Sequence, residues 1–339
     1  MGLLRKMAWP ISMVYGVVVH CRNLLYDHQV LKSKNYKTPT VCVGNLSVGG
    51  TGKTPMIEFL ISKLQKKYKL AVLSRGYKRN SKGFQLGTLH STVEQLGDEP
   101  FQIQRKFPRI QVAVDADRQN GISVLQKLVG PDLILLDDAF QHRRVAPTFS
   151  ILLTTYSNPF FKDRYLPTGD LRDTKRASRR ADCIVVTKCP KNMEKSKEAF
   201  YTKRLKKSSD QIVLFSTLTY DDRLYGNPSL LKLNDLKEKH FTLVTGIANP
   251  SPLIHHLTEN DLDFAYQKFP DHHQFSPSEI ETLKKEPLLL TTEKDYGRFH
   301  DKIQNLYYIK VEHQFLEDGE RELLRAIDTK IKPYSQRWS

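Results

Sequence analysis

Short apolar runs alternate with stretches of helical spacing along most of the chain. In the first two thirds, the apolar runs predict strands at 40–44, 70–74, 110–114, 133–137, 150–154, 184–187 and 212–216. Helices are predicted between them, at 53–67, 98–106, 118–128 and 194–207. Because near-continuous apolar strands separated by helices are typical of a parallel sheet covered on both faces, the pattern predicts an α/β fold.

A second and smaller group of elements follows. Its predicted strands are 241–245, 264–268, 288–291 and 306–311, with helices near 250–259 and 277–285. Residues 217–239, between the two groups, are polar and rich in turn-forming residues, which indicates a hinge. The sequence therefore predicts a first domain over 28–216, a hinge over 217–239 and a second, smaller α/β domain over 240–330.

Residues 1–27 form a separate segment with an apolar run over 7–21. No small-residue cleavage site follows the run, which disfavours a signal peptide. The run is also shorter than the roughly 20 residues that cross the hydrocarbon core. Ser12, Gly16, His20 and Asn23 form one polar stripe at helical spacing. The segment therefore predicts a membrane-associated helix lying in one leaflet, with a helix packed on the body of the protein as the alternative.

Composition narrows the range of partners. The formal net charge of +16 favours an anionic partner, which could be nucleic acid, anionic lipid headgroups or a phosphorylated substrate. The four cysteines lack C-x-x-C spacing, so we expect neither a zinc site nor a disulfide framework. No nucleic-acid-binding motif or aromatic platform accompanies the basic residues, so we expect no nucleic acid.

The motif with the clearest chemistry is SVGGTGKT, which follows a predicted strand and begins a predicted helix. That context is typical of a phosphate-binding loop, in which backbone amides surround phosphate oxygens. Lys53 would neutralise the β and γ phosphates, and the Thr54 hydroxyl would bind Mg²⁺. The predicted ATP-binding residues are Ser47, Val48, Gly49, Gly50, Thr51, Gly52, Lys53 and Thr54.

Two adjacent acids, Asp137 and Asp138, end a predicted strand downstream of this loop. Proteins with such loops hold a metal ion or its water at this place. Because neighbouring residues on a strand point to opposite faces, the two carboxylates are expected to have different roles. A kinase also needs a base near the acceptor hydroxyl, and Asp98 and His272 are candidates, although spacing alone does not bring them together.

Several motifs in this order resemble the tetraacyldisaccharide 4'-kinase family, the membrane-associated kinases of lipid A biosynthesis. The matching stretches are GNLSVGGTGKTP, SRGY, GDEP, DDAFQHR, LPTGDLRD, TGIANP, FPDHHQF and TTEKD. The resemblance implies ATP-dependent phosphorylation of the 4'-hydroxyl of an acylated glucosamine disaccharide 1-phosphate. It also implies two α/β domains joined by a short strand linker, and a location on the cytoplasmic face of the bacterial inner membrane.

The resemblance also assigns residue roles. It implies that Asp98 is the general base, oriented by His272, and that Thr54, Glu99 and Asp137 hold Mg²⁺. The positions that match residues near phosphates or the sugar are Arg75, Arg118, Asp138, Gln141, His142 and Arg172. Nine Lys or Arg residues over 162–191 fit an anionic membrane surface and a phosphorylated lipid.

Two other classes of protein remain as alternatives. A membrane-associated nucleotide switch shares the end of the glycine-rich loop, but its signature lysine aligns with Val48 here. A cytosolic kinase or ligase for a small metabolite would not need the apolar amino terminus.

Overall fold

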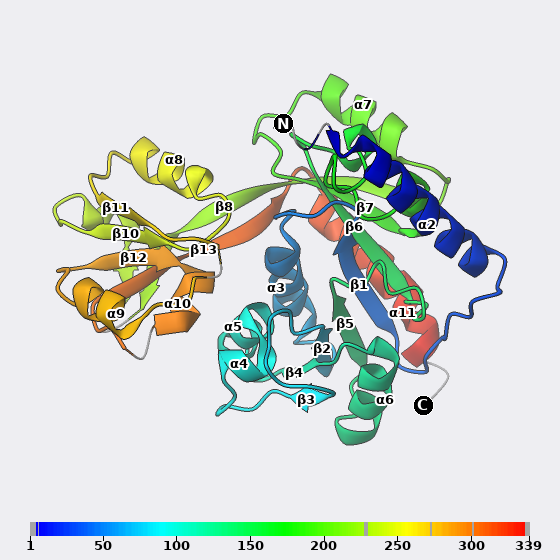
Figure 1. Cartoon of the computed structure of the whole chain (residues 1–339), viewed down its shortest axis with the longest axis horizontal. Coiled ribbons are helices and arrows are strands. Elements are labelled where there is room, and N and C mark those ends of the chain that lie inside the picture. Colours follow the sequence, from blue (N-terminus) through cyan, green and yellow to red (C-terminus); the bar gives the residue numbers. More distant parts are fainter. Residues whose placement is uncertain (1–4, 6, 227–229, 272, 300–301, 336–339) are drawn as a thin grey trace.

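The computed structural model describes residues 5, 7–226, 230–271, 273–299 and 302–335 (Figure 1). The strands of the first half are β1 (Thr40–Asn45), β2 (Leu70–Ser74), β3 (Gln85–Leu86), β4 (Gln111–Val114), β5 (Leu133–Asp137), β6 (Phe149–Thr155) and β7 (Cys183–Thr187). The strands that follow are β8 (Ile212–Gly226), β9 (Leu231–Lys232), β10 (Thr242–Thr245), β11 (Ala265–Lys268), β12 (Leu289–Thr292) and β13 (Leu306–Phe315).

Helices cover both faces of this sheet. The α-helices are α2 (Trp9–Asp27), α3 (Lys53–Leu64), α4 (Val93–Leu96), α5 (Asp98–Lys106), α6 (Arg118–Leu128), α7 (Lys195–Leu205), α8 (Ser251–Glu259), α9 (Pro277–Leu283), α10 (Glu293–Phe299) and α11 (Gly319–Ser335). Short 3₁₀ turns are η1 (Phe160–Lys162), η2 (Lys175–Arg180) and η3 (Leu233–Leu236). The predicted α/β class is confirmed. The predicted strands and helices of both groups are present; the bounds of β2, β5, α5 and α6 are those predicted, and the others have shifted ends.

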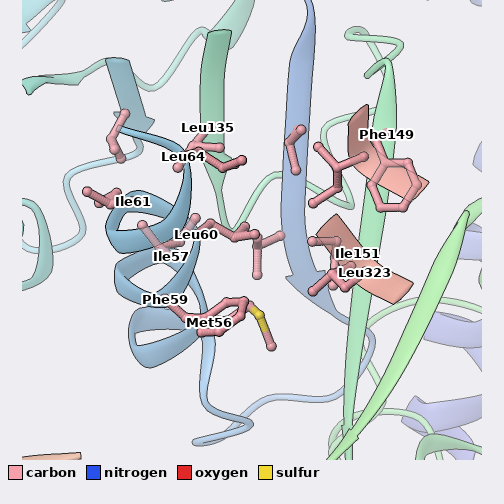
Figure 2. Close-up of a cluster of buried hydrophobic side chains, with 14 of the residues drawn as sticks. Met56, Ile57, Phe59, Leu60, Ile61, Leu64, Leu135, Phe149, Ile151 and Leu323 are labelled. Atoms are coloured by element: carbon pink, nitrogen blue, oxygen red, sulfur yellow. The ribbon is translucent and has the colours of Figure 1, made fainter. Parts of the chain in front are cut away.

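One sheet runs through both halves of the molecule, in the order β11-β10-β12-β13-β8-β7-β6-β1-β5-β2-β4-β3. Strands β8 to β4 are parallel, and every residue of β1, β2 and β5 is buried. Apolar clusters lie on both faces of these strands, which explains their near-continuous apolar sequences. Figure 2 shows one cluster, in which Met56, Leu60 and Leu64 of α3 pack towards the sheet.

The turn-rich interpretation of the first part of 217–239 was wrong, because these residues continue a strand. Ile212–Phe215 pairs with β7, and Ser216–Gly226 pairs antiparallel with β13. At ~3.3 Å per residue, β8 extends about 46 Å and connects the two halves (Figure 1). The strand linker implied by the family resemblance is therefore present, while the use of this segment as a hinge stays a prediction.

Helix α11 was not predicted from the sequence, and it packs on the first half of the molecule rather than the second. Leu323, Ile327 and Ile331 are buried in the same cluster as α3 and β6. Figure 2 shows Leu323 beside Ile151 of β6. The range 240–330, assigned to the smaller domain, thus includes a helix whose apolar stripe completes the core of the first domain. Helical spacing within one segment does not show which core receives the apolar stripe.

Helix α2 packs on the body of the protein through its polar stripe. Ser12 Oγ lies 2.6 Å from Thr168 Oγ1, and Asn23 Nδ2 donates to Asp173 Oδ1 at 2.6 Å. Gly16 meets the ring of Tyr165, where a Cβ would come within 2.9 Å of ring carbons. His20 of the predicted stripe is exposed and Val19 is buried instead, because positions 12, 16, 19 and 23 follow the 3.6-residue period.

The apolar side chains of α2 point away from the protein. Those more than half exposed are Trp9, Ile11, Met13, Val14, Val17 and Val18. Most surface helices turn their apolar face to the core, whereas α2 turns its apolar face outward and its polar stripe to the protein. No helix in the described part of the chain combines the length and hydropathy that crossing a bilayer requires.

The packing of α11 predicts an effect on stability. Replacing the fully buried Leu323 with Ala should lower the free energy of unfolding by about 2–5 kcal/mol, because a cavity opens against α3 and β6. Leu128→Ala makes the same chemical change at a leucine that is 66% exposed, and should cost no more than about 0.5 kcal/mol. Urea unfolding followed by circular dichroism measures both, and equal values would contradict the placement of α11.

Candidate active site

The glycine-rich loop joins the end of β1 to the first turn of α3. Gly49 and Gly52 have φ angles of 111° and 89°, in the region that favours glycine. Gly52 also has no room for a side chain, because a Cβ there would lie 2.9 Å from His313 Nε2. The loop thus has the backbone conformation and the helix amino terminus that an anion-binding loop needs.

Hydrogen bonds from neighbouring segments hold the loop in place. Ser47 Oγ donates to Asp163 Oδ2 at 2.7 Å, and the Val48 amide donates to the Asp170 carbonyl at 2.7 Å. At the other end, Thr187 Oγ1 donates to the Thr51 carbonyl at 2.9 Å. Ser47, which replaces a glycine of the usual pattern, therefore has a partner that a glycine would lack.

The two acids at the end of β5 have different surroundings, as the strand geometry predicts. Asp137 is buried and accepts a hydrogen bond from Ser74 Oγ at 3.0 Å, while its Oδ1 has no partner among the described residues. Burial, with Glu99 and Asp138 nearby, raises the pKa of Asp137 to about 7 despite the opposing effect of Lys53. A cation placed at Oδ1 would relieve this repulsion.

Asp138 adopts a positive φ of 46° and faces cations. Its Oδ2 lies 3.9 Å from Lys53 Nζ and accepts from Arg172 Nη1 at 3.2 Å. Burial alone would raise the pKa of Asp138, but Lys53 and Arg172 hold it below its ordinary value. Arg172 also donates to Asn45 at the end of β1, so it links this carboxylate to the phosphate-loop strand.

Three other residues predicted to contact the phosphates or the sugar have different surroundings. Arg118 is buried and donates to the carbonyls of Asp115 and Asp137, which gives it a structural task. Gln141 Nε2 donates to the Asn45 carbonyl at 2.6 Å. Arg75, by contrast, is exposed at the end of β2, and its guanidinium makes no hydrogen bond or ion pair within the described residues. Of these three side chains, only Arg75 is available to a ligand as it stands.

His142 lies half-buried beside Arg118. Burial, followed by repulsion from Arg118, lowers the pKa of His142. Its Nε2 is buried and has no hydrogen-bond partner among the described residues. A neutral imidazole in this setting is suited to a hydrogen bond with a hydroxyl group.

Asp98, the predicted base, lies in the first turn of α5 and is held from the second half of the molecule. Arg298 of α10 donates to Asp98 Oδ2 at 2.7 Å. Arg298 is held in turn by the fully buried Asp295, which accepts from Arg298 Nη1 at 2.9 Å. His272, the predicted partner of Asp98, lies outside the described residues. Arg298 was missed by sequence reasoning, although Asp295 belongs to the TTEKD motif used there.

Two further side chains near the loop were also missed. His313 of β13 contacts the Gly52 carbonyl through Nε2 at 2.9 Å and Ser216 Oγ through Nδ1 at 3.0 Å. Burial lowers the pKa of His313 to about 4, so it is neutral at physiological pH and donates from Nε2 to the carbonyl. Lys188, just after β7, places Nζ 4.0 Å from where a Cβ of Gly50 would lie. Both approach the loop from distant sequence, where no local motif marks them.

A second link between the halves is a buried charge cluster beneath the site. Lys106 of α5 lies 2.7 Å from Glu58 Oε2 of α3 and 2.9 Å from Glu293 Oε2 of α10. All three side chains are at most 13% exposed. Burial, with repulsion from Glu293, raises the pKa of Glu58 to about 7 despite the nearby Lys106. Together with Asp98–Arg298, this cluster joins α5 to α10.

These features define a class of protein. A glycine-rich loop lies between a buried parallel strand and a helix, and an acid pair ends the adjoining strand β5. This is the arrangement of P-loop α/β proteins, which bind nucleotide phosphates.

Comparisons with known proteins identify the family. A sequence model described as Tetraacyldisaccharide-1-P 4'-kinase (LpxK) matches residues 4–332, so the chain belongs to the tetraacyldisaccharide 4'-kinase family. The tetraacyldisaccharide 4'-kinase of Flavobacterium johnsoniae is 44% identical over 98% of this chain and 100% of that one. That of Flavobacterium psychrophilum is 45% identical over 95% of each chain. The resemblance drawn from the motifs is confirmed.

A solved structure is similar over the whole length. The crystal structure of LpxK from Aquifex aeolicus in complex with ATP has a TM-score of 0.80 and 29% sequence identity, covering 97% of this chain and 99% of that one. The fold described above is therefore that of the family, including the sheet shared by both halves.

The buried charge cluster predicts a pH-dependent loss of stability. Lys106→Met leaves two buried carboxylates without their cation and should cost about 3–5 kcal/mol. Glu58 already has a raised pKa in the folded state, so its ionisation destabilises the fold as pH rises from ~4.5 to ~7. Without Lys106 this pKa rises further, so the loss should be greater at pH ~8 than at pH ~6 in urea unfolding.

Two variants serve as controls for this prediction. Lys284→Met breaks an exposed pair with Glu281 and should change stability by less than about 1 kcal/mol. A neutral triple variant, Glu58→Gln, Lys106→Met and Glu293→Gln, should recover much of the loss and its pH dependence. A loss of equal size at both pH values would contradict the titration assigned to Glu58.

Proposed function

We propose that this protein transfers the γ-phosphoryl group of ATP to the 4'-hydroxyl of an acylated glucosamine disaccharide 1-phosphate. The observation that carries the proposal is the Asp98–Arg298 pair, because it fixes a carboxylate at the amino terminus of α5 from across the two halves. Glu99, the residue after Asp98, raises the pKa of Asp137. The first turn of α5 therefore lies near the acid pair Asp137 and Asp138, beside the phosphate loop. ATP in the Aquifex aeolicus structure supports the choice of nucleotide.

Asp98 acts as the general base in this proposal. Its carboxylate accepts the proton of the 4'-hydroxyl as the oxygen attacks the γ-phosphorus, and the bond from that phosphorus to the bridging oxygen breaks. The ion pair with Arg298 fixes the direction of the carboxylate. The family resemblance implies that His272 orients Asp98.

Lys53 and the loop amides stabilise charge on the transferred group. The Lys53 ammonium has only a weak contact with Asp138 at 3.9 Å, so phosphate oxygens can replace that contact without leaving Lys53 unpaired. Arg172 keeps Asp138 neutralised when Lys53 turns to phosphate. The loop residues 47–54 thereby bind the nucleotide through backbone and side-chain donors.

The residues at the acid pair fit a magnesium ion. The buried Asp137 Oδ1 has no partner among the described residues, and Glu99 and the Thr54 hydroxyl supply further oxygens of the kind Mg²⁺ prefers. The described residues contain no group of three His, Cys, Asp or Glu side chains that could hold a metal ion. In this proposal, phosphate oxygens and water would supply the remaining ligands. When bound, Mg²⁺ neutralises charge on the β and γ phosphates.

The outward apolar face of α2 attaches the protein to the cytoplasmic face of the inner membrane. Its exposed side chains bury in the acyl region, and the basic residues of 162–191 contact anionic headgroups. A lipid acceptor stays in the bilayer because each methylene brought into water costs about 0.8 kcal/mol, so the enzyme must work at the interface.

The role of Asp98 predicts a kinetic defect. Asp98→Asn keeps the shape of the side chain and removes its basicity, so kcat should fall by about 10²–10⁴. The affinity for ATP, measured by calorimetry, should stay near the wild-type value because the loop is untouched. Glu94→Gln, at an exposed acid of α4, should leave kcat unchanged. A kcat for Asp98→Asn within a factor of three of wild type would remove Asp98 as the base.

The role of α2 predicts a change in membrane binding. Replacing Val14, Val17 and Val18 with Glu should release the protein from neutral lipid vesicles, because charges replace the apolar face. Leu89→Glu and Leu128→Glu place charges at exposed leucines elsewhere and should leave flotation unchanged. Undiminished binding of the Val14, Val17 and Val18 variant would show that this face does not enter the bilayer.

A further inference from the structure

A pocket of about 200 Å³ lies between the second half of α2 and η2. None of the residues assigned above to phosphoryl transfer lines it. Its lining carries four guanidinium groups and one carboxylate, with one leucine at its edge. These residues are Arg143, Arg176, Arg179, Arg180, Asp27 and Leu24.

Arg143 and Arg180 form a fixed inner wall. Arg143 donates to the Asn23 carbonyl at 2.9 Å and to Asp27 Oδ1 at 2.7 Å. Arg180 donates to the Phe140 carbonyl at 2.9 Å and to Asp173 Oδ2 at 3.2 Å. Arg180 Nε is buried and has no partner in the described part of the chain. Their hydrogen bonds hold both guanidinium groups in place before any ligand arrives.

Arg176 and Arg179 stand at the mouth of the pocket. Both are exposed, and neither makes a hydrogen bond or ion pair with another described residue. They lie three residues apart on a 3₁₀ turn, where side chains at i and i+3 project in the same direction. Since Asp27 and Asp173 already pair with Arg143 and Arg180, the mouth carries two uncompensated positive charges.

The pocket adjoins the apolar face of α2. Leu24 lines the pocket and is also 39% exposed, next to the similarly exposed Leu25. With the apolar face of α2 among acyl chains, the flank where η2 meets the helix lies at the depth of the headgroups. A ligand reaching the pocket from this side carries hydrocarbon next to an anionic group.

We propose that this pocket binds the phosphate of a bilayer phospholipid lying beside α2. A planar guanidinium group can donate two parallel hydrogen bonds to two oxygens of one phosphate. The guanidinium groups of Arg176 and Arg179, at the mouth of the pocket, are available for such bonds. The lipid's acyl chains would lie along Leu24 and the rest of the apolar face. The inference rests on the proposed membrane attachment and adds a headgroup site to it.

Vesicle binding of the full chain tests the proposal. One set of phosphatidylcholine vesicles contains phosphatidylglycerol, and a second has the same surface charge supplied by oleate, which offers a carboxylate instead. The wild-type protein should bind the phosphatidylglycerol vesicles several-fold more tightly. Arg176→Ala with Arg179→Ala should weaken that binding by about tenfold or more and abolish the preference. These two side chains have no partners to lose, so the melting temperature should not change.

A control variant and the comparison of the two anionic vesicles distinguish binding in the pocket from general electrostatic attraction to the membrane. Lys239→Ala with Lys285→Ala removes the same charge from exposed positions on the other half of the molecule and should keep the preference. Equal wild-type affinity for both anionic vesicles would overturn the pocket while leaving membrane attachment intact. Failure of the wild type to bind any vesicle would overturn both.

Kinase kinetics distinguish two sources of the bound phosphate, which are a bilayer phospholipid and the 1-phosphate of the acceptor. With the acceptor presented in neutral detergent micelles, the Arg176→Ala and Arg179→Ala variant should keep the wild-type kcat and KM, because no bilayer phospholipid is present. A raised KM in these micelles would assign the arginines to the 1-phosphate of the acceptor and overturn the bilayer source. Kinase activity of the wild type in the same assay tests the proposed function independently.

Discussion

The antiparallel pairing of β8 with β13 is the interaction on which the arrangement of the molecule depends. It makes one sheet out of two groups of strands, so the position of α10 relative to α5 is determined by backbone hydrogen bonds. The same ribbon carries His313 to the carbonyl of Gly52. Without this pairing, neither the contact between Arg298 and Asp98 nor the support behind the glycine-rich loop would form.

The charges at the centre of the molecule follow one physical rule, that a buried charge needs a partner of opposite sign. Asp138 has Lys53 and Arg172, Asp98 has Arg298, and the Glu58 and Glu293 pair shares Lys106. Asp137 is the exception, since its Oδ1 has no partner among the described residues. An unbalanced carboxylate among balanced ones is where a cation contributes most.

Much of this could be predicted from the sequence because the information was local. Apolar runs predicted the parallel strands, and SVGGTGKT predicted the loop because strand, turn and helix are contiguous. The acid pair at the end of β5 was predicted for the same reason. Local patterns also predicted three of the four buried positions of α2, which are Ser12, Gly16 and Asn23, since helical spacing is visible in one segment. The fourth is Val19 and not the predicted His20.

What could not be predicted depends on pairing between distant segments. Polar residues after Ser216 were interpreted as turns, because nothing nearby shows that β13 pairs with them. Arg298, His313 and Lys188 lie far in sequence from the residues they approach. Arg118 and Gln141 were predicted as ligand contacts. In the structure both donate to backbone carbonyls, which was not predicted, and their contact with a ligand stays a prediction. Residue type alone does not distinguish these two uses.

The attachment of α2 through polar contacts constrains how the whole molecule can stand on a surface. Ser12 and Asn23 hold the helix to Thr168 and Asp173 by buried hydrogen bonds, which would be left unsatisfied if the helix swung away. The helix is therefore attached rigidly to the rest of the protein. If α2 lies on a surface, the whole protein keeps one tilt and one distance from that surface. It can then rotate only about the axis perpendicular to the surface.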